Sequence, residues 1–176
     1  MAIQIVLVVE ADERSRSDYI YIRSVLEKWF NLHLLNNVKF SAVFMGGKGN
    51  YNKKKVVNEI NTHIKRFNAL GETHVVYCFD TDKYDSDPND RKLLADEEKY
   101  CKDKGYDFVW FCHDIEEVFL GKSVTKSEKT DKARRYSANN GIDNINKENL
   151  KAETMTKGKS NLLCVLNKLL YAQECQ

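Results

Sequence analysis

The sequence predicts an α/β domain in which a four-stranded, mainly parallel sheet is flanked by helices in a doubly wound, Rossmann-like arrangement. The first observation behind this prediction is that short apolar runs alternate with amphipathic segments over residues 3–112. The second is the length, because 176 residues suffice for one domain with a sizeable core. The third is that one Pro and eight Gly leave little room for long linkers. We therefore expect a single domain over residues 1–176.

Four runs of mostly β-favouring residues are the expected strands, at residues 3–9, 38–45, 74–79 and 107–112. A short apolar run bounded by turn residues is typical of a strand buried in a parallel sheet. The run at 38–45 alternates more than the others, which favours a position nearer the sheet edge. The flavodoxin-like strand order, with the first and third strands side by side, is our hypothesis for the topology.

Three helices are expected between these strands: at residues 16–30, after the Gly-rich stretch at 46–50, and at 90–104. Ser15 and Asp18 resemble a capping box at the start of the first helix, with Asp replacing the usual Glu. Gly71 lies where a glycine is expected to cap the end of the second helix, and Gly105 should stop the third.

The remaining chain differs in composition from residues 1–120. Residues 121–159 are a basic polar extension, rich in Lys, Ser, Thr and Asn and with few large apolar side chains. A last helix is expected over residues 160–176. Ser160 is its candidate N-cap, and its apolar face is formed by leucines. These are Leu162, Leu163, Leu166, Leu169 and Leu170.

The bulk numbers predict a cytoplasmic protein that does not enter membranes. No stretch approaches the roughly 20 apolar residues that span a bilayer. The first residues lack a basic segment followed by a cleavage site, so no signal peptide is expected. Five Cys without any C-x-x-C pair indicate reduced thiols, and Cys78 and Cys112 are expected to be small core residues. A net charge of +2 does not by itself indicate nucleic-acid binding.

Acidic side chains follow two of the predicted strands. Glu10 ends the first strand, and Asp80 and Asp82 follow the third. Ligands of open α/β sheets bind beyond the carboxyl ends of the strands, and carboxylate oxygens are preferred by Mg²⁺. Taken one at a time, such acids more often start turns or cap helices. Taken together, they predict a site for Mg²⁺ or Mn²⁺ that is formed by Glu10, Asp80 and Asp82.

The segments Val9-Glu10 and Phe79-Asp80-Thr81-Asp82, with helices between them, resemble the Toprim domain. That domain occurs in topoisomerases, bacterial primases, recombination mediators and the overcoming-lysogenization-defect nucleases. The resemblance implies that Asp80 and Asp82 are Mg²⁺ ligands. It also implies that Glu10 is a general acid/base or contributes to the metal site. In the family a Gly commonly follows the Glu, whereas this chain has Ala11.

The segment from Cys112 to Leu120 is similar to one in the stand-alone RloB-like Toprim proteins, where an acid followed by large apolar residues comes after the fourth strand. By this resemblance Glu117 is the matching catalytic acid, with Glu116 next to it. The resemblance covers roughly residues 3–120. It also implies a role in prokaryotic defence.

Basic residues are the candidate contacts to nucleic acid. One interpretation of the run at 122–135 is a mobile, solvated loop, and the other is contact with a phosphate backbone. Gly46 and Gly47 either form a strand-to-helix turn or bring backbone N–H groups and Lys48 to a phosphate. The candidates for contact are Lys48, Lys122, Lys126, Lys132, Arg134, Arg135 and Lys159.

Two functions follow as hypotheses. The first is a metal-dependent nuclease that hydrolyses phosphodiester bonds of DNA or RNA, with Glu10, Asp80, Asp82 and Glu117 as its catalytic residues. The second is a non-catalytic module that binds nucleic acid or protein and works with a partner, either another protein or a second copy of the chain.

Overall fold

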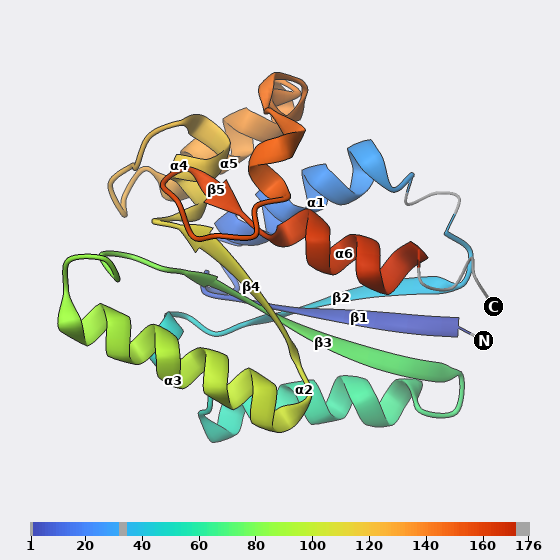
Figure 1. The fold of residues 1–176 in the computed structure, drawn as a ribbon. Coiled ribbons are helices and arrows are strands. Elements are labelled where there is room, and N and C mark those ends of the chain that lie inside the picture. Colours follow the sequence, from blue (N-terminus) through green and yellow to red (C-terminus); the bar gives the residue numbers. More distant parts are fainter. Residues whose placement is uncertain (1, 32–34, 172–176) are drawn as a thin grey trace. The chain divides into compact units, whose positions relative to one another are not determined.

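Figure 1 shows the computed structural model, which describes residues 2–31 and 35–171. The described strands form a five-stranded sheet in the order β2-β1-β3-β4-β5. This order places β1 beside β3, as the flavodoxin-like hypothesis predicts. Their bounds are β1 Ala2–Val9, β2 Val38–Phe44, β3 Gly71–Asp80, β4 Asp107–Cys112 and β5 Lys159–Ser160. The predicted α/β class with a mainly parallel sheet flanked by helices is confirmed.

The predicted number of four strands is wrong, because β5 adds a fifth. It comprises two residues and pairs antiparallel with the end of β4, Ser160 opposite Phe111 and Lys159 opposite Cys112. A two-residue strand has no periodicity that the sequence could display. Its pairing depends on β4 being present to receive it.

The chain divides into two compact units, which are described separately. The first contains residues 1–77 and 125–144, and the second contains residues 78–124 and 145–176. Both units are therefore built from two separate stretches of the chain.

In the first unit, β1 and β2 pair in parallel, from Ile3 opposite Val38 to Val9 opposite Phe44. The strand β1 is buried from Ile3 to Val9, which explains its continuous apolar run. The strand β2 is an end strand of the sheet and is only partly buried, as its alternating sequence predicts.

Two helices of the first unit, α1 (Ser17–Trp29) and α2 (Lys54–Phe67), lie close to the predicted ranges. The predicted capping box is wrong. Arg16 precedes α1 in a left-handed conformation without a side-chain cap, and Asp18 instead accepts a hydrogen bond from the backbone N–H of Ala11. A short 3₁₀ turn, η2 (Lys48–Asn50), precedes α2.

The basic extension contributes a helix to the first unit. Residues Lys129–Ala138 form α5, followed by the 3₁₀ turn η3 (Gly141–Asn144). The ring of Tyr136 meets that of Tyr21 on α1 edge to face, with centroids 5.0 Å apart. Ala133 and Ile142 are also buried. The interpretation of residues 129–135 as a mobile loop is therefore wrong, because a few apolar side chains dock this segment.

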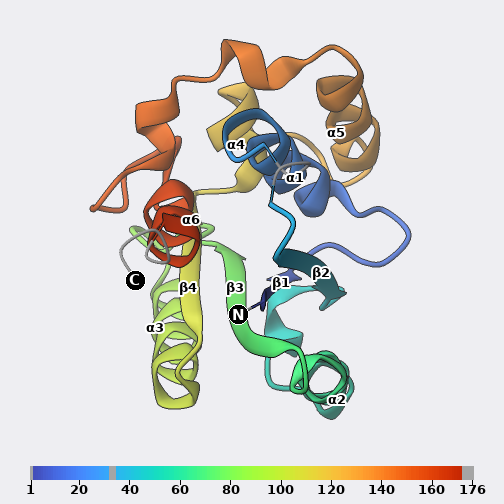
Figure 2. The same cartoon turned by 90° about the vertical axis from the view of Figure 1, so that its right-hand side faces the viewer.

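In the second unit, α3 (Pro88–Lys104) runs alongside β4 (Figure 2). Asp87 caps it by accepting the backbone N–H of Asn89, and Gly105 ends it in a left-handed conformation at φ 68°, as predicted. The other helical segments are α4 (Ile115–Leu120), the 3₁₀ turn η4 (Lys147–Leu150) and α6 (Leu162–Tyr171).

The last helix begins as the sequence predicts. The hydroxyl of Ser160 accepts the backbone N–H of Leu162 at 3.1 Å, and the five predicted leucines are buried. The predicted continuation over residues 172–176 lies outside the described residues. Within residues 2–31 and 35–171, none of the helices combines the length and apolarity that crossing a membrane requires.

The prediction that Gly71 caps the end of α2 is wrong. Gly71 is the first residue of β3. A Cβ built on it would lie 1.7 Å from the carbonyl oxygen of Ala2, so the backbones of β3 and β1 approach too closely here for any side chain. We expect Gly71→Ala to lower the free energy of unfolding by about 1–3 kcal/mol or more, the usual range for overpacking. Denaturant titration measures this change. Gly49→Ala is the matched control, because a Cβ on Gly49 meets nothing within 4 Å. Equal stability of both variants would contradict the close approach.

Candidate active site

In the second unit, the loop that follows β3 is hydrogen-bonded to the end of β4. The backbone N–H of Thr81 donates to the carbonyl of Phe111 at 3.0 Å, and that of Asp82 donates to the carbonyl of His113 at 2.8 Å. Asp82 has a φ of 46°, a left-handed conformation that Asp tolerates better than most residues. The Asp-x-Asp motif and the segment after β4 therefore belong to one region of this unit.

Asp80 is nearly buried and connects β3 to α4. Its Oδ1 accepts the backbone N–H of Ile115, the first residue of α4, at 2.9 Å. This contact satisfies one of the N–H groups that a helix leaves unpaired in its first turn. Asp80 thus has the structural role that strand-end acids often have, together with its place in the predicted metal site.

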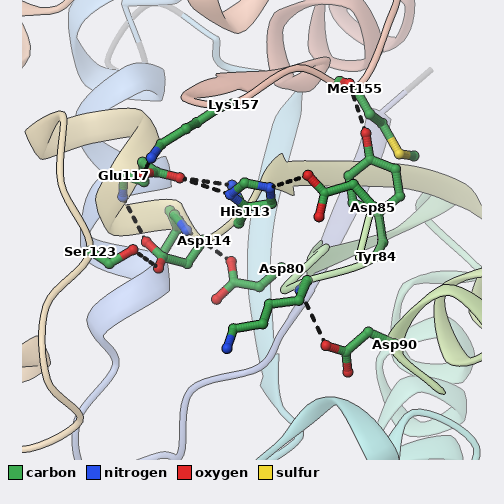
Figure 3. Close-up of polar contacts among 12 residues, drawn as sticks. Asp80, Tyr84, Asp85, Asp90, His113, Asp114, Glu117, Ser123, Met155 and Lys157 are labelled. Atoms are coloured by element: carbon green, nitrogen blue, oxygen red, sulfur yellow. Dashed lines mark hydrogen bonds and ion pairs between the residues drawn. The ribbon is translucent and has the colours of Figure 1, made fainter. Parts of the chain in front are cut away.

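A second acid, Asp114, caps α4 (Figure 3). Its Oδ1 accepts the backbone N–H of Glu117 at 2.7 Å, and its Oδ2 accepts the hydroxyl of Ser123 at 2.5 Å. Sequence reasoning did not identify Asp114. The signal was present, because Asp-x-x-Glu before an apolar run matches a helix start.

Glu117 and Asp80 are the two buried members of the predicted catalytic acids, and 8% of the Glu117 side chain is exposed. Its Oε2 lies 3.2 Å from both the backbone nitrogen and Nδ1 of His113, and its Oε1 lies 3.1 Å from Nζ of Lys157. Burial by itself raises the pKa of Glu117. The N–H of His113 and the charge of Lys157 outweigh it and hold the pKa below its ordinary value. Glu117 is therefore ionised at neutral pH.

Sequence reasoning also missed His113 and Asp85. The Nε2 of His113 lies 3.1 Å from Oδ2 of Asp85, so the imidazole lies between two carboxylates (Figure 3). This contact lowers the pKa of Asp85. Contact between residues 28 positions apart in the chain follows from the fold and leaves no local pattern in the sequence.

Glu10 directly follows β1 in the first unit. Its carbonyl accepts the backbone N–H of Gly47 at 2.8 Å, and the N–H of Ala11 donates to Oδ2 of Asp18 at 2.8 Å. Ala11 does not have a positive φ, so this loop does not need the glycine that is common in the Toprim family. The carboxylate of Asp18 therefore holds the backbone that carries Glu10.

The predicted basic contacts fall in both units. Lys126, Lys132, Arg134 and Arg135 belong to the first unit, where Arg135 pairs with Asp131 at 2.9 Å. Lys122 and Lys159 belong to the second unit and are exposed. The side-chain nitrogen of Lys48 is buried, which distinguishes it from the others.

The chemistry of the acids in the second unit fits a hard cation. Mg²⁺ is usually held by one or two carboxylates together with waters and phosphate oxygens, a number that the Asp80 and Asp82 pair supplies. In the described part of the chain, no group of three His, Cys, Asp or Glu side chains is arranged to hold a metal ion. The binding of Mg²⁺ or Mn²⁺ stays a prediction.

The three buried cysteines of the described residues are poorly suited to act as nucleophiles. Cys78, Cys101 and Cys112 are buried, as predicted for Cys78 and Cys112. Burial raises the pKa of Cys101 to about 12, and it also raises that of Cys112. Thiols with raised pKa values are poor nucleophiles, because the thiolate is the reactive form.

Comparison with known proteins leaves the family open. No family model matches the sequence, and no curated protein or solved structure matches the chain. The resemblance to the Toprim domain therefore remains a prediction that rests on the motifs.

Replacing Lys157 tests the electrostatics of Glu117. We expect Lys157→Met to raise the pKa of Glu117, because the opposite charge 3.1 Å away is lost. Carboxyl-carbon NMR during a pH titration measures this pKa. Lys159→Met, which removes another exposed cation of the second unit, should leave it unchanged. If both variants titrate like the wild type, the ion pair does not form in solution.

The contribution of Asp18 to the free energy of unfolding changes with pH in the direction opposite to that of an ordinary surface acid. Burial raises its pKa above 3.8 despite the N–H of Ala11 and the charge of Lys129. Stability from a raised carboxyl pKa is complete below 3.8 and is lost as the pH rises through the folded-state pKa. We expect Asp18→Asn to be at least as stable as the wild type near neutral pH, since its amide oxygen still accepts the N–H of Ala11. This advantage should disappear in acid.

Thermal unfolding at several pH values measures this effect. Asp12→Asn is the control, because backbone N–H groups of Ser15 and Arg14 lower the pKa of exposed Asp12. Stability from a lowered pKa is present above 3.8 and is lost as the pH falls, so this variant should be less stable near neutral pH. A pH profile of the same sign for both variants would contradict the burial of Asp18.

Proposed function

We propose that the chain is a nuclease of the Toprim type, which hydrolyses phosphodiester bonds of DNA or RNA and depends on Mg²⁺ or Mn²⁺. The observation that carries the proposal is the backbone pairing of the Asp80-x-Asp82 loop with the segment that leads to Glu117. This pairing gathers three of the four predicted catalytic acids in one region of the second unit. A cytoplasmic location and a role in prokaryotic defence belong to the same proposal.

The residues of the second unit have separate tasks in this proposal. Asp80 and Asp82 would hold the cation, which when bound would polarise the scissile phosphate and lower the pKa of the attacking water. Glu117, which is ionised, accepts a hydrogen bond from that water and orients it. The resemblance adds Glu10 as a metal ligand or proton carrier.

Cations of the second unit supply contacts to the substrate. Lys122, Lys157 and Lys159 are exposed and belong to the unit that carries these acids. Each phosphate that such a side chain neutralises releases counterions, so binding weakens steeply as salt rises. Positive charge beside an acidic site is needed to hold a polyanion there.

The second candidate is a binding module without catalysis. It is favoured by a specific observation, namely that the carboxylate of Glu117 is already in contact with Lys157 and His113. A module of this kind would bind nucleic acid or a protein partner, or assemble with a second copy of the chain, and would leave the chemistry to another protein.

Cleavage assays with the full chain decide between the two. We expect Mg²⁺- or Mn²⁺-dependent cleavage of labelled single- or double-stranded DNA or RNA. Asp80→Asn should lower kcat by about 100-fold or more. Replacing a residue that only supports a metal ligand already costs up to about 100-fold, and Asp80 is assigned as a ligand itself. The amide oxygen still accepts the N–H of Ile115, so the start of α4 is preserved. Asp96→Asn, at an exposed position of α3, should cleave normally.

The contrary outcomes are distinct. Cleavage by Asp80→Asn at the wild-type rate would contradict the assignment of Asp80 to the active site. Salt-sensitive binding without cleavage of any of the four substrates, with either metal, would favour the binding module.

A further inference from the structure

The imidazole of His113 connects two segments of the second unit that are distant in sequence. Its Nε2 lies 3.1 Å from Oδ2 of Asp85, in the loop after β3, and its Nδ1 lies 3.2 Å from Oε2 of Glu117 on α4 (Figure 3). An ionised carboxylate only accepts hydrogen bonds, so the ring nitrogen is the donor wherever such a bond forms. Both nitrogens of the ring face acids.

The segment that carries Asp85 is hydrogen-bonded to α3. The guanidinium of Arg91 donates to the carbonyls of Tyr84 and Asp85, each at 3.0 Å. The hydroxyl of Tyr84 donates to the carbonyl of Met155 at 2.8 Å. The backbone that carries Asp85 is thus held on two sides, and Asp85 is a defined anchor for the imidazole.

On the other side of the imidazole lies Glu117, whose two contacting side chains differ in mobility. Lys157 has 72% of its side chain exposed, whereas the side chain of His113 is 27% exposed. A lysine has four rotatable side-chain bonds and a hydrated ammonium group, whereas histidine has two such bonds and a planar ring. His113 is therefore the side chain that can fix the orientation of the Glu117 carboxylate.

We propose that His113 is the positioning residue of Glu117, and that Asp85 fixes the imidazole from the opposite side. Orientation matters because a misplacement of about 1 Å at a reacting group can cost about 100-fold in rate. The effect on rate rests on the nuclease function proposed above. The contact itself does not.

Two substitutions at residue 113 distinguish the contribution of Nδ1 from that of Nε2. The amide nitrogen of Asn occupies approximately the place of Nδ1, so His113→Asn retains the donor to Glu117. The amide nitrogen of Gln occupies approximately the place of Nε2, so His113→Gln retains only the contact with Asp85. We expect His113→Gln to lower kcat by about 10- to 100-fold with unchanged KM, and His113→Asn to recover most of the wild-type kcat.

A second readout does not depend on cleavage. The carboxyl-carbon chemical shift of Glu117, assigned by its absence in Glu117→Gln, reports the hydrogen bonds of this carboxylate. It should move in His113→Gln and stay near the wild-type value in His113→Asn. His63→Asn, on α2 in the first unit, is the control for loss of an imidazole elsewhere.

These measurements separate failure of the inference from failure of the proposed function. Equal kcat values and equal shifts in the Asn and Gln variants would overturn the positioning role. If the wild type cleaves nothing, the nuclease proposal fails and the shift of Glu117 still decides the role of His113. If His113→Gln does not fold, Asp85→Ala at an exposed position is the substitute, and an unchanged Glu117 shift in that variant would overturn the role assigned to Asp85.

Discussion

Two backbone hydrogen bonds hold together the region from which the candidate site is built. They join Thr81 to Phe111 and Asp82 to His113, beyond the point at which β3 ends. Through them, the loop after β3 follows the path of β4 and its continuation. The contacts of Asp80 with α4 and of Asp85 with His113 depend on this shared path. Loss of this pairing would free each acid to point elsewhere.

The first turn of α4 carries two acidic side chains, Glu116 and Glu117. Lys157 forms an ion pair with Glu117, and His113 contacts the same carboxylate. Acids at a helix N-terminus are favoured by the helix dipole, which supports Glu116 and Glu117 there. Exposed pairs such as Arg23–Glu27 contribute only about 0.3–0.5 kcal/mol each, so the fold does not depend on them. An enclosed carboxylate that loses its partner keeps the cost of its desolvation without the compensating contact. The contacts of Glu117 with His113 and Lys157 therefore matter more than their number suggests.

Sequence patterns predicted the elements whose periodicity reports burial. The run from Ile3 to Val9, the strand Asp107–Cys112 and the glycine at 105 agree with the structure. The helix α5 was missed, because Ala133 and Tyr136 are too few to show a helical stripe. Gly71 was assigned to a helix end, because the sequence cannot show that the backbone of Ala2 passes close to it.

The sequence by itself determined the α/β class, the parallel strands and the acids that end them, because alternation of apolar runs and strand-end carboxylates are local properties. It also predicted the start of the last helix at Ser160. Only the tertiary structure decided that His113 lies between Asp85 and Glu117, and that Lys157 pairs with Glu117. These contacts join residues 4 to 40 positions apart through loops whose paths are set by packing. No local pattern encodes such a path.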